Sequence, residues 1–310
     1  MKVVFFGTPD FAVNALDSIV GSSHTVLAVV TQPDKRVGRH SELQFSDVKK
    51  RAIMHDITVL QYEKVSSEGL DDLRKLNADI FVTCAFGQIL SKELIDIPKY
   101  GVINVHASLL PKYRGASPIQ HAILNGDKET GVTIMQTEVS LDSGDIILSE
   151  KIDILPDETA DELFVRLSIL GANLVVTALD KIEDGTATFT KQNHDEATFV
   201  KQIKKQDALI DFSKDPITLR NFVRGMQSWP CAFTYFNGKM LKIFRVNAVK
   251  CDNLQTEFGT VLTADKSGLT VSCNGGYIEV LELQLEGGKR MPASDFLLGR
   301  KIQVGTRLGI

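Results

Sequence analysis

The sequence has few residues of the kinds that form disulfides, structural zinc sites or membrane spans. Its four cysteines, Cys84, Cys231, Cys251 and Cys273, lie far apart and include no C-x-x-C pair. We therefore expect reduced thiols and no metal site. No apolar run approaches the ~20 residues that a membrane-spanning helix needs, and the amino terminus carries no cleavable apolar segment. These absences predict a cytoplasmic protein that does not enter a membrane.

Glycine-rich phosphate-binding motifs are also absent. The first apolar run ends in Gly7-Thr8-Pro9 rather than in G-x-G-x-x-G, and there is no Walker loop. Pro9 and Asp10 stand where glycine would let the backbone approach a pyrophosphate. A nicotinamide cofactor is therefore not expected, and Pro9 is better explained as the start of a helix.

Length and charge indicate two domains of different character. A chain of 310 residues is long enough for two domains. Residues 1–200 carry 19 Lys/Arg against 29 Asp/Glu, whereas residues 201–310 carry 16 against 10. The basic carboxyl-terminal part indicates either a polyanionic partner such as nucleic acid or simply a solvated lysine-rich face. The polar stretch 186–207 has the composition of a linker, so we predict domains at 1–206 and 207–310.

Hydrophobic periodicity predicts the fold class of each domain. Apolar runs that are typical of buried strands lie at 2–6, 26–31, 57–61, 80–85 and 102–106. Segments between them have helical spacing, and 159–182 predicts a long helix, so the first domain should be a Rossmann-like α/β fold with a mostly parallel sheet. Short strands separated by Gly and Asn turns predict a small, OB-like β-barrel after the linker. They lie at 233–236, 241–246, 259–262, 269–273 and 278–285.

One predicted strand carries an amide and an imidazole on the same face. Residues 101–120 read GVINVHASLLPKYRGASPIQ, and side-chain alternation puts Asn104 and His106 on one face of this strand. A second strand at 131–137 leads to Asp142, and if the two strands are neighbours the three polar side chains can converge. Ligands bind beyond the carboxyl ends of strands in open α/β sheets. Such a cluster is either structural or catalytic, and it contains no obvious nucleophile.

The motifs INVHASLLPKYRGASPIQ and LDSGD resemble those of the folate-dependent formyltransferases. Agreement extends to residues 4–12, to 85–90, and to 289–291 and 295–297, so it spans almost the whole chain. The carboxyl-terminal segments resemble most closely the members of this family that act on transfer RNA.

The resemblance implies a reaction and its catalytic residues. The formyl group of 10-formyltetrahydrofolate would pass to the amino group of methionyl initiator tRNA, without a metal and without a covalent enzyme intermediate. Asn104 and the protonated ring of His106 would donate hydrogen bonds to the formyl oxygen as it gains negative charge. Asp142 would organise the proton transfer, directly or through water, and keep His106 charged.

The resemblance also implies where each substrate binds. Folate would contact the tetrad Ser108, Leu109, Leu110 and Pro111, and two loops that contain Phe86, Gly87, Gln88, Ile89, Leu90 and Val139. Arg114 is a candidate to meet a phosphate or the glutamate tail. Relatives insert a basic, proline-containing loop into the acceptor stem of the tRNA, but residues 37–45 read VGRHSELQF here, with Glu42 among the expected positive charges. Arg39, Lys289 and Arg290 are the candidate tRNA contacts, and we expect a monomer.

Two other functions remain open from the sequence. A formyltransferase of the same fold that acts on an amino sugar nucleotide would also carry a carboxyl-terminal barrel, whereas an enzyme for a purine precursor would end near residue 200. A catalytically silent RNA-binding protein is the alternative from another class, and the intact set of Asn104, His106 and Asp142 argues against it.

Overall fold

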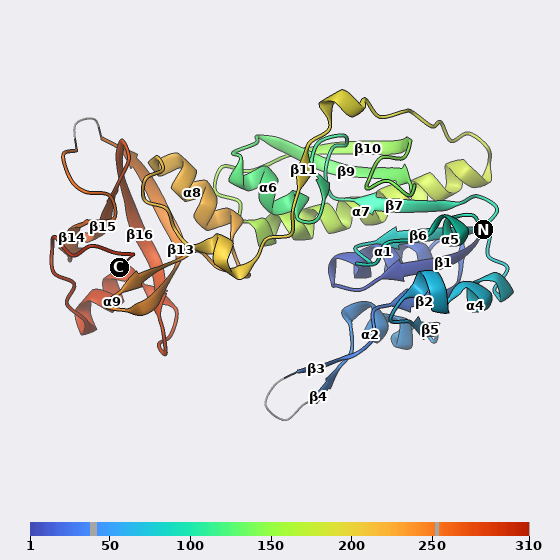
Figure 1. The fold of residues 1–310 in the computed structure, drawn as a ribbon, viewed down its shortest axis with the longest axis horizontal. Helices are drawn as coiled ribbons and strands as arrows, with labels where there is room; N and C mark the ends of the chain where they lie inside the picture. Colours follow the sequence, from blue (N-terminus) through green and yellow to red (C-terminus); the bar gives the residue numbers. More distant parts are fainter. Residues whose placement is uncertain (38–41, 252–253, 310) are drawn as a thin grey trace. The chain divides into compact units, whose positions relative to one another are not determined.

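The computed structural model describes residues 1–37, 42–251 and 254–309. They form two compact units, and the chain of both is drawn in Figure 1. Unit 1 comprises Met1–Pro118, Glu129–Asp153 and Phe164–Val200. Unit 2 comprises Ile119–Lys128, Ile154–Leu163 and Lys201–Ile310. Residues 119–128 and 154–163, together with 201–206 at the end of the predicted first domain, therefore belong to the second unit.

Unit 1 is built on a seven-stranded sheet with the strand order β10-β9-β7-β6-β1-β2-β5. Strands β7, β6, β1, β2 and β5 are parallel to one another. Strand β9 is antiparallel to β7, and β10 is antiparallel to β9. The mostly parallel sheet of the prediction is thus confirmed. The bounds are β1 Lys2–Gly7, β2 Thr25–Thr31, β5 Thr58–Gln61, β6 Ile80–Cys84, β7 Val102–His106, β9 Glu129–Gln136 and β10 Ile146–Asp153.

Strand β10 was not predicted, and its position explains why. It lies at the edge of the sheet, and more than half of its side chains are partly or fully exposed to solvent. Its sequence, IILSEKID, therefore has no need of the continuous apolar run that marks the central strands. The predicted strands in the middle of the sheet are almost wholly buried, which is why periodicity located them.

Helices and short strands complete unit 1. The Asp10 carboxylate accepts a hydrogen bond from the Phe11 amide at 3.0 Å and so caps the first helix. The helices are α1 Phe11–Val20, α2 Asp47–Met54, α3 Val65–Glu68, α4 Leu70–Lys75, α5 Lys92–Ile95 and α7 Ala160–Glu183, of which the last begins within unit 2. The short strands form two pairs, β3 Lys35–Val37 with β4 Glu42–Gln44 and β8 Arg114–Gly115 with β11 Phe199–Val200.

Helix α7 is long and apolar enough to cross a membrane by length and composition, which the sequence analysis did not expect. Half of its most apolar window is buried inside the protein. A side chain at Gly171 would meet Val105 of β7 at 2.8 Å, so the glycine lets α7 lie closely against the sheet. Phe164 packs edge-on against Phe11 of α1 at 5.1 Å between ring centroids. These are the contacts of a core helix, and Figure 1 shows α7 running alongside the sheet.

The polar segment 186–207 is divided between the units. Residues up to Val200 belong to unit 1, where Thr190 exchanges backbone hydrogen bonds with Ile146 of β10. β11 then pairs in parallel with β8. The polar residues of this segment form hydrogen bonds to the rest of unit 1, as described below. Amino-acid composition alone cannot distinguish polar residues that make such bonds from polar residues that are exposed to solvent in a linker.

Unit 2 contains an antiparallel sheet with the order β12-β13-β16-β15-β14, to which β17 adds on β16. The final segment joins the two ends of this sheet, because the Leu308 amide donates to Gly259 beside β14 and the Gly309 amide donates to Tyr235 of β12. Closure of this kind is what the predicted barrel requires. The bounds are β12 Phe233–Phe236, β13 Lys239–Lys250, β14 Val261–Asp265, β15 Gly268–Cys273, β16 Gly276–Leu285, β17 Met291–Pro292, α6 Pro118–Leu124, α8 Pro216–Gly225, α9 Ala293–Gly299 and the 3₁₀ turn Lys205–Ala208.

Candidate active site

The polar face of β7 is set by its two neighbours. Asn104 and His106 lie two residues apart on this strand and therefore point to the same side of the sheet. Asn104 stands opposite Thr83 of β6, and His106 stands opposite Thr133 of β9. The prediction that β7 and the strand leading to Asp142 are neighbours is therefore confirmed.

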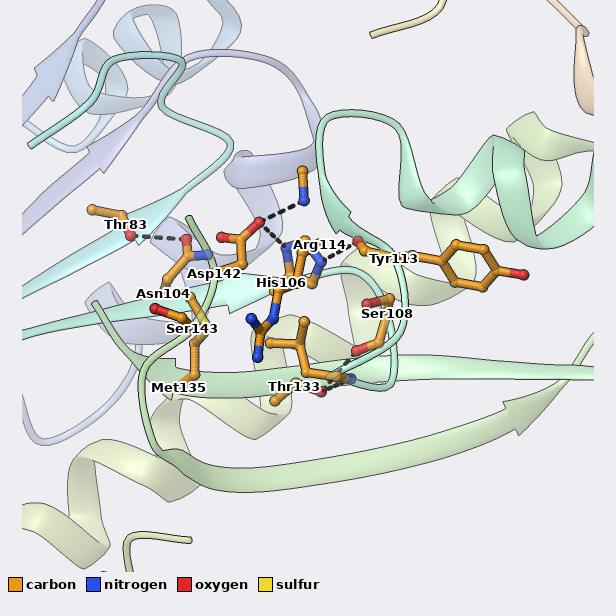
Figure 2. Close-up of polar contacts among 12 residues, drawn as sticks. Thr83, Asn104, His106, Ser108, Tyr113, Arg114, Thr133, Met135, Asp142 and Ser143 are labelled. Carbon is orange, nitrogen blue, oxygen red and sulfur yellow. Dashed lines mark hydrogen bonds and ion pairs between the residues drawn. The ribbon is translucent and has the colours of Figure 1, made fainter. Parts of the chain in front are cut away.

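The amide of Asn104 is oriented by a hydroxyl on the neighbouring strand. The Thr83 hydroxyl donates to Oδ1 of Asn104 at 2.8 Å. Because the carboxamide oxygen is engaged there, the NH₂ group points away from Thr83 and toward Asp142, as Figure 2 shows. Among the described residues, that NH₂ group has no hydrogen-bond acceptor within reach. Asn104 therefore offers a free donor to a ligand.

His106 is held between a backbone carbonyl and a carboxylate. Its Nε2 atom lies 3.0 Å from the Tyr113 carbonyl oxygen. A carbonyl can only accept, so Nε2 carries a proton and donates it. Nδ1 faces Oδ2 of Asp142 at 3.7 Å, and both side chains are largely buried (Figure 2). The geometry thus makes His106 the partner of Asp142 and leaves Asn104 as the donor whose N–H is free.

Asp142 is fixed by a backbone contact from β8. Its Oδ2 atom accepts a hydrogen bond from the Gly115 amide at 2.8 Å. Gly115 has φ +109°, and a Cβ atom there would lie 2.3 Å from the Val200 carbonyl oxygen, so only glycine fits. Asp142 itself has φ +46°, a left-handed conformation that a non-glycine residue adopts only when its surroundings hold it there.

The predicted folate tetrad shapes the loop above the site. The Ser108 hydroxyl donates to the Lys112 carbonyl at 2.6 Å, so it closes the loop. The Thr133 hydroxyl of β9 donates to the Ser108 carbonyl at 2.7 Å and accepts from the Leu110 amide at 3.2 Å. Ser108 and Leu110 are buried, whereas Leu109 is partly exposed. The first and third residues of the tetrad therefore position backbone, and Leu109 is the more accessible apolar surface.

The two predicted folate loops carry exposed apolar side chains. Ile89 is 85% exposed, and Val139 and Leu141 are 59% and 58% exposed. Phe86 and Leu90 are instead buried in the core, and the Gln88 side chain hydrogen-bonds the Tyr62 carbonyl. Isolated exposure of this kind is common, but three large apolar side chains on the loops next to a polar cluster suit a planar aromatic ligand.

A cavity of about 310 Å³ lies where β7 begins and β9 ends. Its lining includes the residues that lead into the loop of Val139 and Asp142, but none from 86–90. Thr137 is one of the lining residues, and its hydroxyl is buried without a hydrogen-bond partner among the described residues. The complete lining is Ile95, Asp96, Pro98, Lys99, Gly101, Val102, Gln136, Thr137 and Glu138.

The expectation that Arg114 meets a phosphate or the glutamate tail is wrong. Arg114 is only 4% exposed, and its guanidinium bonds to the side chains of Gln192 and His194. The Gln192 amide in turn donates to the carbonyl oxygens of Asp142 and Gly144. Sequence reasoning missed Gln192 because it lies in a polar stretch, and no local pattern separates one buried polar residue from its exposed neighbours.

The candidate tRNA contacts have different surroundings. Lys289 is exposed, whereas Arg290 makes two hydrogen bonds of 2.7 Å to the Glu282 carboxylate and stacks 4.2 Å from the Phe244 ring. These hydrogen bonds hold the pKa of Glu282 below its ordinary value. Arg39 lies outside the described residues. Much of the Arg290 charge is thus neutralised within unit 2.

Metal ligands do not gather anywhere in the described part of the chain. Within residues 1–37, 42–251 and 254–309, no group of three or more His, Cys, Asp or Glu side chains is arranged to hold a metal ion. The four cysteines are not joined by disulfides, and burial raises the pKa of the Cys84 thiol. The chemistry that this site can perform is hydrogen-bond donation from Asn104 and proton transfer through Asp142 and His106.

Comparisons with known proteins give the family. Residues 1–179 match the family described as formyl transferase, and residues 202–301 match that described as formyl transferase, C-terminal domain. The methionyl-tRNA formyltransferase of Lachnospira eligens is 49% identical over 314 aligned residues, which cover 100% of both chains.

Solved structures share the fold. An N-formyltransferase from Helicobacter canadensis, in complex with folinic acid and dTDP-3-aminofucose, matches with a TM-score of 0.67 at 22% identity, over 94% of this chain and 100% of that one. A methionyl-tRNA formyltransferase from Clostridium thermocellum matches with a TM-score of 0.57 at 19% identity, over 80% and 94%. These likenesses do not separate tRNA from sugar substrates, but the full-length sequence identity does. The chain therefore belongs to the methionyl-tRNA formyltransferases of the formyl transferase family.

Proposed function

We propose that this protein transfers the formyl group of 10-formyltetrahydrofolate to the amino group of methionyl initiator tRNA at the start of translation, and that it works as a cytoplasmic monomer. The observation that carries the proposal is the site on β7, where the free amide N–H of Asn104 lies beside the His106–Asp142 pair. That arrangement occurs in a chain that aligns along its whole length with methionyl-tRNA formyltransferases.

The reaction follows from what each side chain can do. The methionyl amine attacks the formyl carbon, a C–N bond forms, and the formyl oxygen becomes negatively charged in a tetrahedral intermediate. The NH₂ group of Asn104 donates a hydrogen bond to that oxygen, and it is already oriented by Thr83 when substrate arrives. Because the donor needs no rearrangement, it stabilises the transition state more than the ground state.

Asp142 and His106 handle the proton. The attacking nitrogen must lose a proton, and the folate nitrogen must gain one as its bond to the formyl carbon breaks. Asp142 accepts the first proton, directly or through water, and returns a proton to the leaving nitrogen. The His106 ring faces Oδ2 of Asp142 through Nδ1 at 3.7 Å and helps to hold the carboxylate in place. No electron is gained or lost, and no covalent bond to the protein forms.

We propose that folate lies against the exposed apolar side chains of Ile89, Val139 and Leu141 and beside the tetrad Ser108, Leu109, Leu110 and Pro111. The basic unit 2 would bind the tRNA, with Lys289 as the more available cation of the pair Lys289 and Arg290, since Glu282 occupies the latter.

A second candidate function is formylation of an amino sugar nucleotide. It is favoured by one finding, the structural likeness to an N-formyltransferase that holds dTDP-3-aminofucose in its crystal structure. That likeness is at 22% sequence identity and concerns the fold alone. The same polar site on β7 would serve either acceptor amine, so the acceptor must be tested directly.

The test is a formylation assay with competing acceptors. The protein is incubated with 10-formyltetrahydrofolate and either methionyl initiator tRNA, methionyl elongator tRNA or dTDP-3-aminofucose, and formylated product is measured. We expect formyl transfer to the initiator tRNA, and loss of that activity in the Asn104→Ala variant. Transfer to the sugar nucleotide alone would reject the proposed acceptor. Transfer to none of them, by a folded protein that binds folate, would reject the proposed reaction.

A further inference from the structure

We infer that Gln192 is a positioning residue for Asp142, which it holds in place by tying the backbone of the Asp142 loop to buried Arg114. The inference rests on the proposed function, because it assigns Asp142 a catalytic role. Gln192 lies 50 residues from Asp142 in the sequence and 78 from Arg114, so only the fold brings the three together.

Every hydrogen-bonding position of the Gln192 amide is in use. Its Oε1 atom accepts from Nε and Nη2 of Arg114 at 3.1 and 2.7 Å. Its Nε2 atom donates to the carbonyl oxygens of Asp142 at 3.0 Å and Gly144 at 2.7 Å. Arginine can only donate and a carbonyl can only accept, so the orientation of the amide is unambiguous. The side chain therefore bridges β8 and the backbone of the Asp142 loop.

Burial makes these bonds difficult to replace with water. Gln192 is 6% exposed and Arg114 is 4% exposed. Among the described residues, Arg114 has no carboxylate within ion-pair distance, and its remaining polar partner is Nδ1 of His194 at 2.9 Å. The Gln192 oxygen is therefore the chief acceptor for a buried cation. Loss of that oxygen would leave donors unsatisfied in a dry site, which is strongly unfavourable.

Strand β8 fixes both the side chain and the backbone of Asp142. Gly115, the neighbour of Arg114 in β8, donates its amide to the Asp142 carboxylate at 2.8 Å. Arg114 reaches the Asp142 carbonyl through Gln192. The same two-residue strand therefore holds the carboxylate directly and the left-handed backbone of Asp142 indirectly. Together they keep Oδ2 beside His106, where proton transfer needs it.

Pairing of β8 with β11 fixes the strand itself. Arg114 and Gly115 stand opposite Phe199 and Val200, and the Tyr113 amide donates to the Thr198 hydroxyl at 2.8 Å. Tyr113 also provides the carbonyl that accepts from His106. Segment 192–200 thus contacts both of the loops that position His106 and Asp142, and Gln192 makes the first of these contacts.

The decisive variant is Gln192→Glu, which changes one atom of the amide and almost no volume. A glutamate keeps acceptors for Arg114 and so preserves the partner of the buried cation. It cannot donate to the two carbonyl oxygens, and its second carboxylate oxygen would face them instead. We therefore expect the melting temperature to stay within a few degrees of wild type while the Asp142 loop loses its anchor.

We expect kcat to fall between ~10-fold and ~10²-fold in Gln192→Glu, since a displacement of about 1 Å in a catalytic group has effects of that size. The Michaelis constants for folate and tRNA should change little. The dependence of kcat on pH should also shift, because Asp142 would no longer be held at its distance from His106. Asn173→Asp is the matched control: it makes the same amide-to-carboxylate change at an exposed position of α7 in unit 1, and we expect wild-type kinetics.

A second variant separates positioning from general stability. Arg114→Lys removes the two-pronged contact to Gln192, and we expect the same kinetic defect. Combined with Gln192→Glu it should add little to the larger single effect, because both act through one contact. Independent, multiplied effects of the two changes would overturn the inference. So would Gln192→Glu with kcat within twofold of wild type and an unchanged pH profile.

Wild-type activity is measured first, so that an error in the proposed function can be distinguished from an error in the role of Gln192. If the wild-type protein formylates a different amine, the acceptor in the proposed function is wrong, and the same variants are compared with that amine. If the wild-type protein is active and Gln192→Glu equals it, only the role of Gln192 is rejected. If Gln192→Glu fails to fold at the assay temperature, Arg114→Lys decides the question by its kcat and pH profile.

Discussion

Replacement of Asn104 by alanine tests whether its free amide is the donor to the formyl oxygen. Loss of one oxyanion donor lowers the rate by ~10²–10³-fold, which corresponds to about 2.7–4 kcal/mol. Asn104 is partly buried on a strand between two others and is not part of the apolar core, so the fold should persist. Single-turnover formylation at saturating folate measures the chemical step, and a separate binding assay with a folate analogue controls for occupancy of the site.

Removal of the Thr83 hydroxyl tests the orientation of the Asn104 amide and should have a smaller effect on the rate. It donates to Oδ1 of Asn104 at 2.8 Å, and valine would replace it with almost the same shape. A typical net loss of about 0.5–1.5 kcal/mol for one hydrogen bond predicts a decrease of about 2- to 13-fold in rate for Thr83→Val. Thr83→Ser keeps the hydroxyl and should stay near wild type.

The three variants should therefore rank in a fixed order, with Thr83→Ser fastest, then Thr83→Val, then Asn104→Ala. Near-normal turnover in Asn104→Ala, with folate binding intact, would refute the oxyanion role. A Thr83→Val variant as slow as Asn104→Ala would show that the hydroxyl does more than orient the amide. A fully active Thr83→Val variant would show that Asn104 needs no such orientation.

Three further outcomes follow from the site and from unit 2. Asp142→Asn should lower kcat by ~10²–10⁴-fold because proton transfer is lost. Its melting curve should not change, since the asparagine oxygen can still accept from the Gly115 amide. A variant with the full wild-type rate would exclude Asp142 from proton transfer. Gly115→Ala should destabilise the protein by about 1–3 kcal/mol or more, because φ +109° is strained for alanine and its Cβ would meet the Val200 carbonyl at 2.3 Å; urea unfolding measures this, and a neutral result would contradict the geometry. Hydrogen bonds from Arg290 lower the pKa of Glu282 below its ordinary value of 4.5. The pair therefore stabilises the fold at pH values above 4.5, and this stabilisation is lost as the pH falls through the lowered pKa of Glu282. Glu282→Gln should therefore reduce stability at pH ~7 by about 0.5 kcal/mol, the scale of a half-exposed pair, and the difference from wild type should vanish at low pH; a difference that persists in acid would mean that packing rather than charge is responsible.

Alternation and periodicity were enough to locate the catalytic strand. Val102–His106 was predicted with the bounds that the structure has, because it is a buried central strand whose apolar residues surround two polar ones. Asp142 required one additional assumption, that its strand neighbours β7, and the antiparallel register of β9 bears this out. Buried strands leave a strong signal in sequence, and so did the polar residues that interrupt them.

The partners of buried charges could not be predicted in the same way. Arg114 looked like a ligand contact because arginine is seldom buried, yet its acceptor is Gln192, far along the chain. Arg290 looked like a free cation, although Glu282 on the neighbouring strand occupies it. The acceptor of Arg114 lies 78 residues away and that of Arg290 lies eight residues away across paired strands, and composition near either residue carries no information about these contacts.

The division of unit 2 into three chain segments has a consequence for how this protein can be cut or recombined. Leu124 packs against the apolar core of unit 2, and Arg220 and Arg224 hydrogen-bond the segment around Asp157 and Glu158. A fragment that ends at Val200 would leave Leu124 and the segment around Asp157 and Glu158 without the partners that residues 201–310 provide. The carboxyl-terminal third is therefore not an exchangeable module. A chimera that takes this third from a relative must inherit residues 119–128 and 154–163 from the same parent, so viable crossover points are set by contacts and not by the boundary visible in sequence.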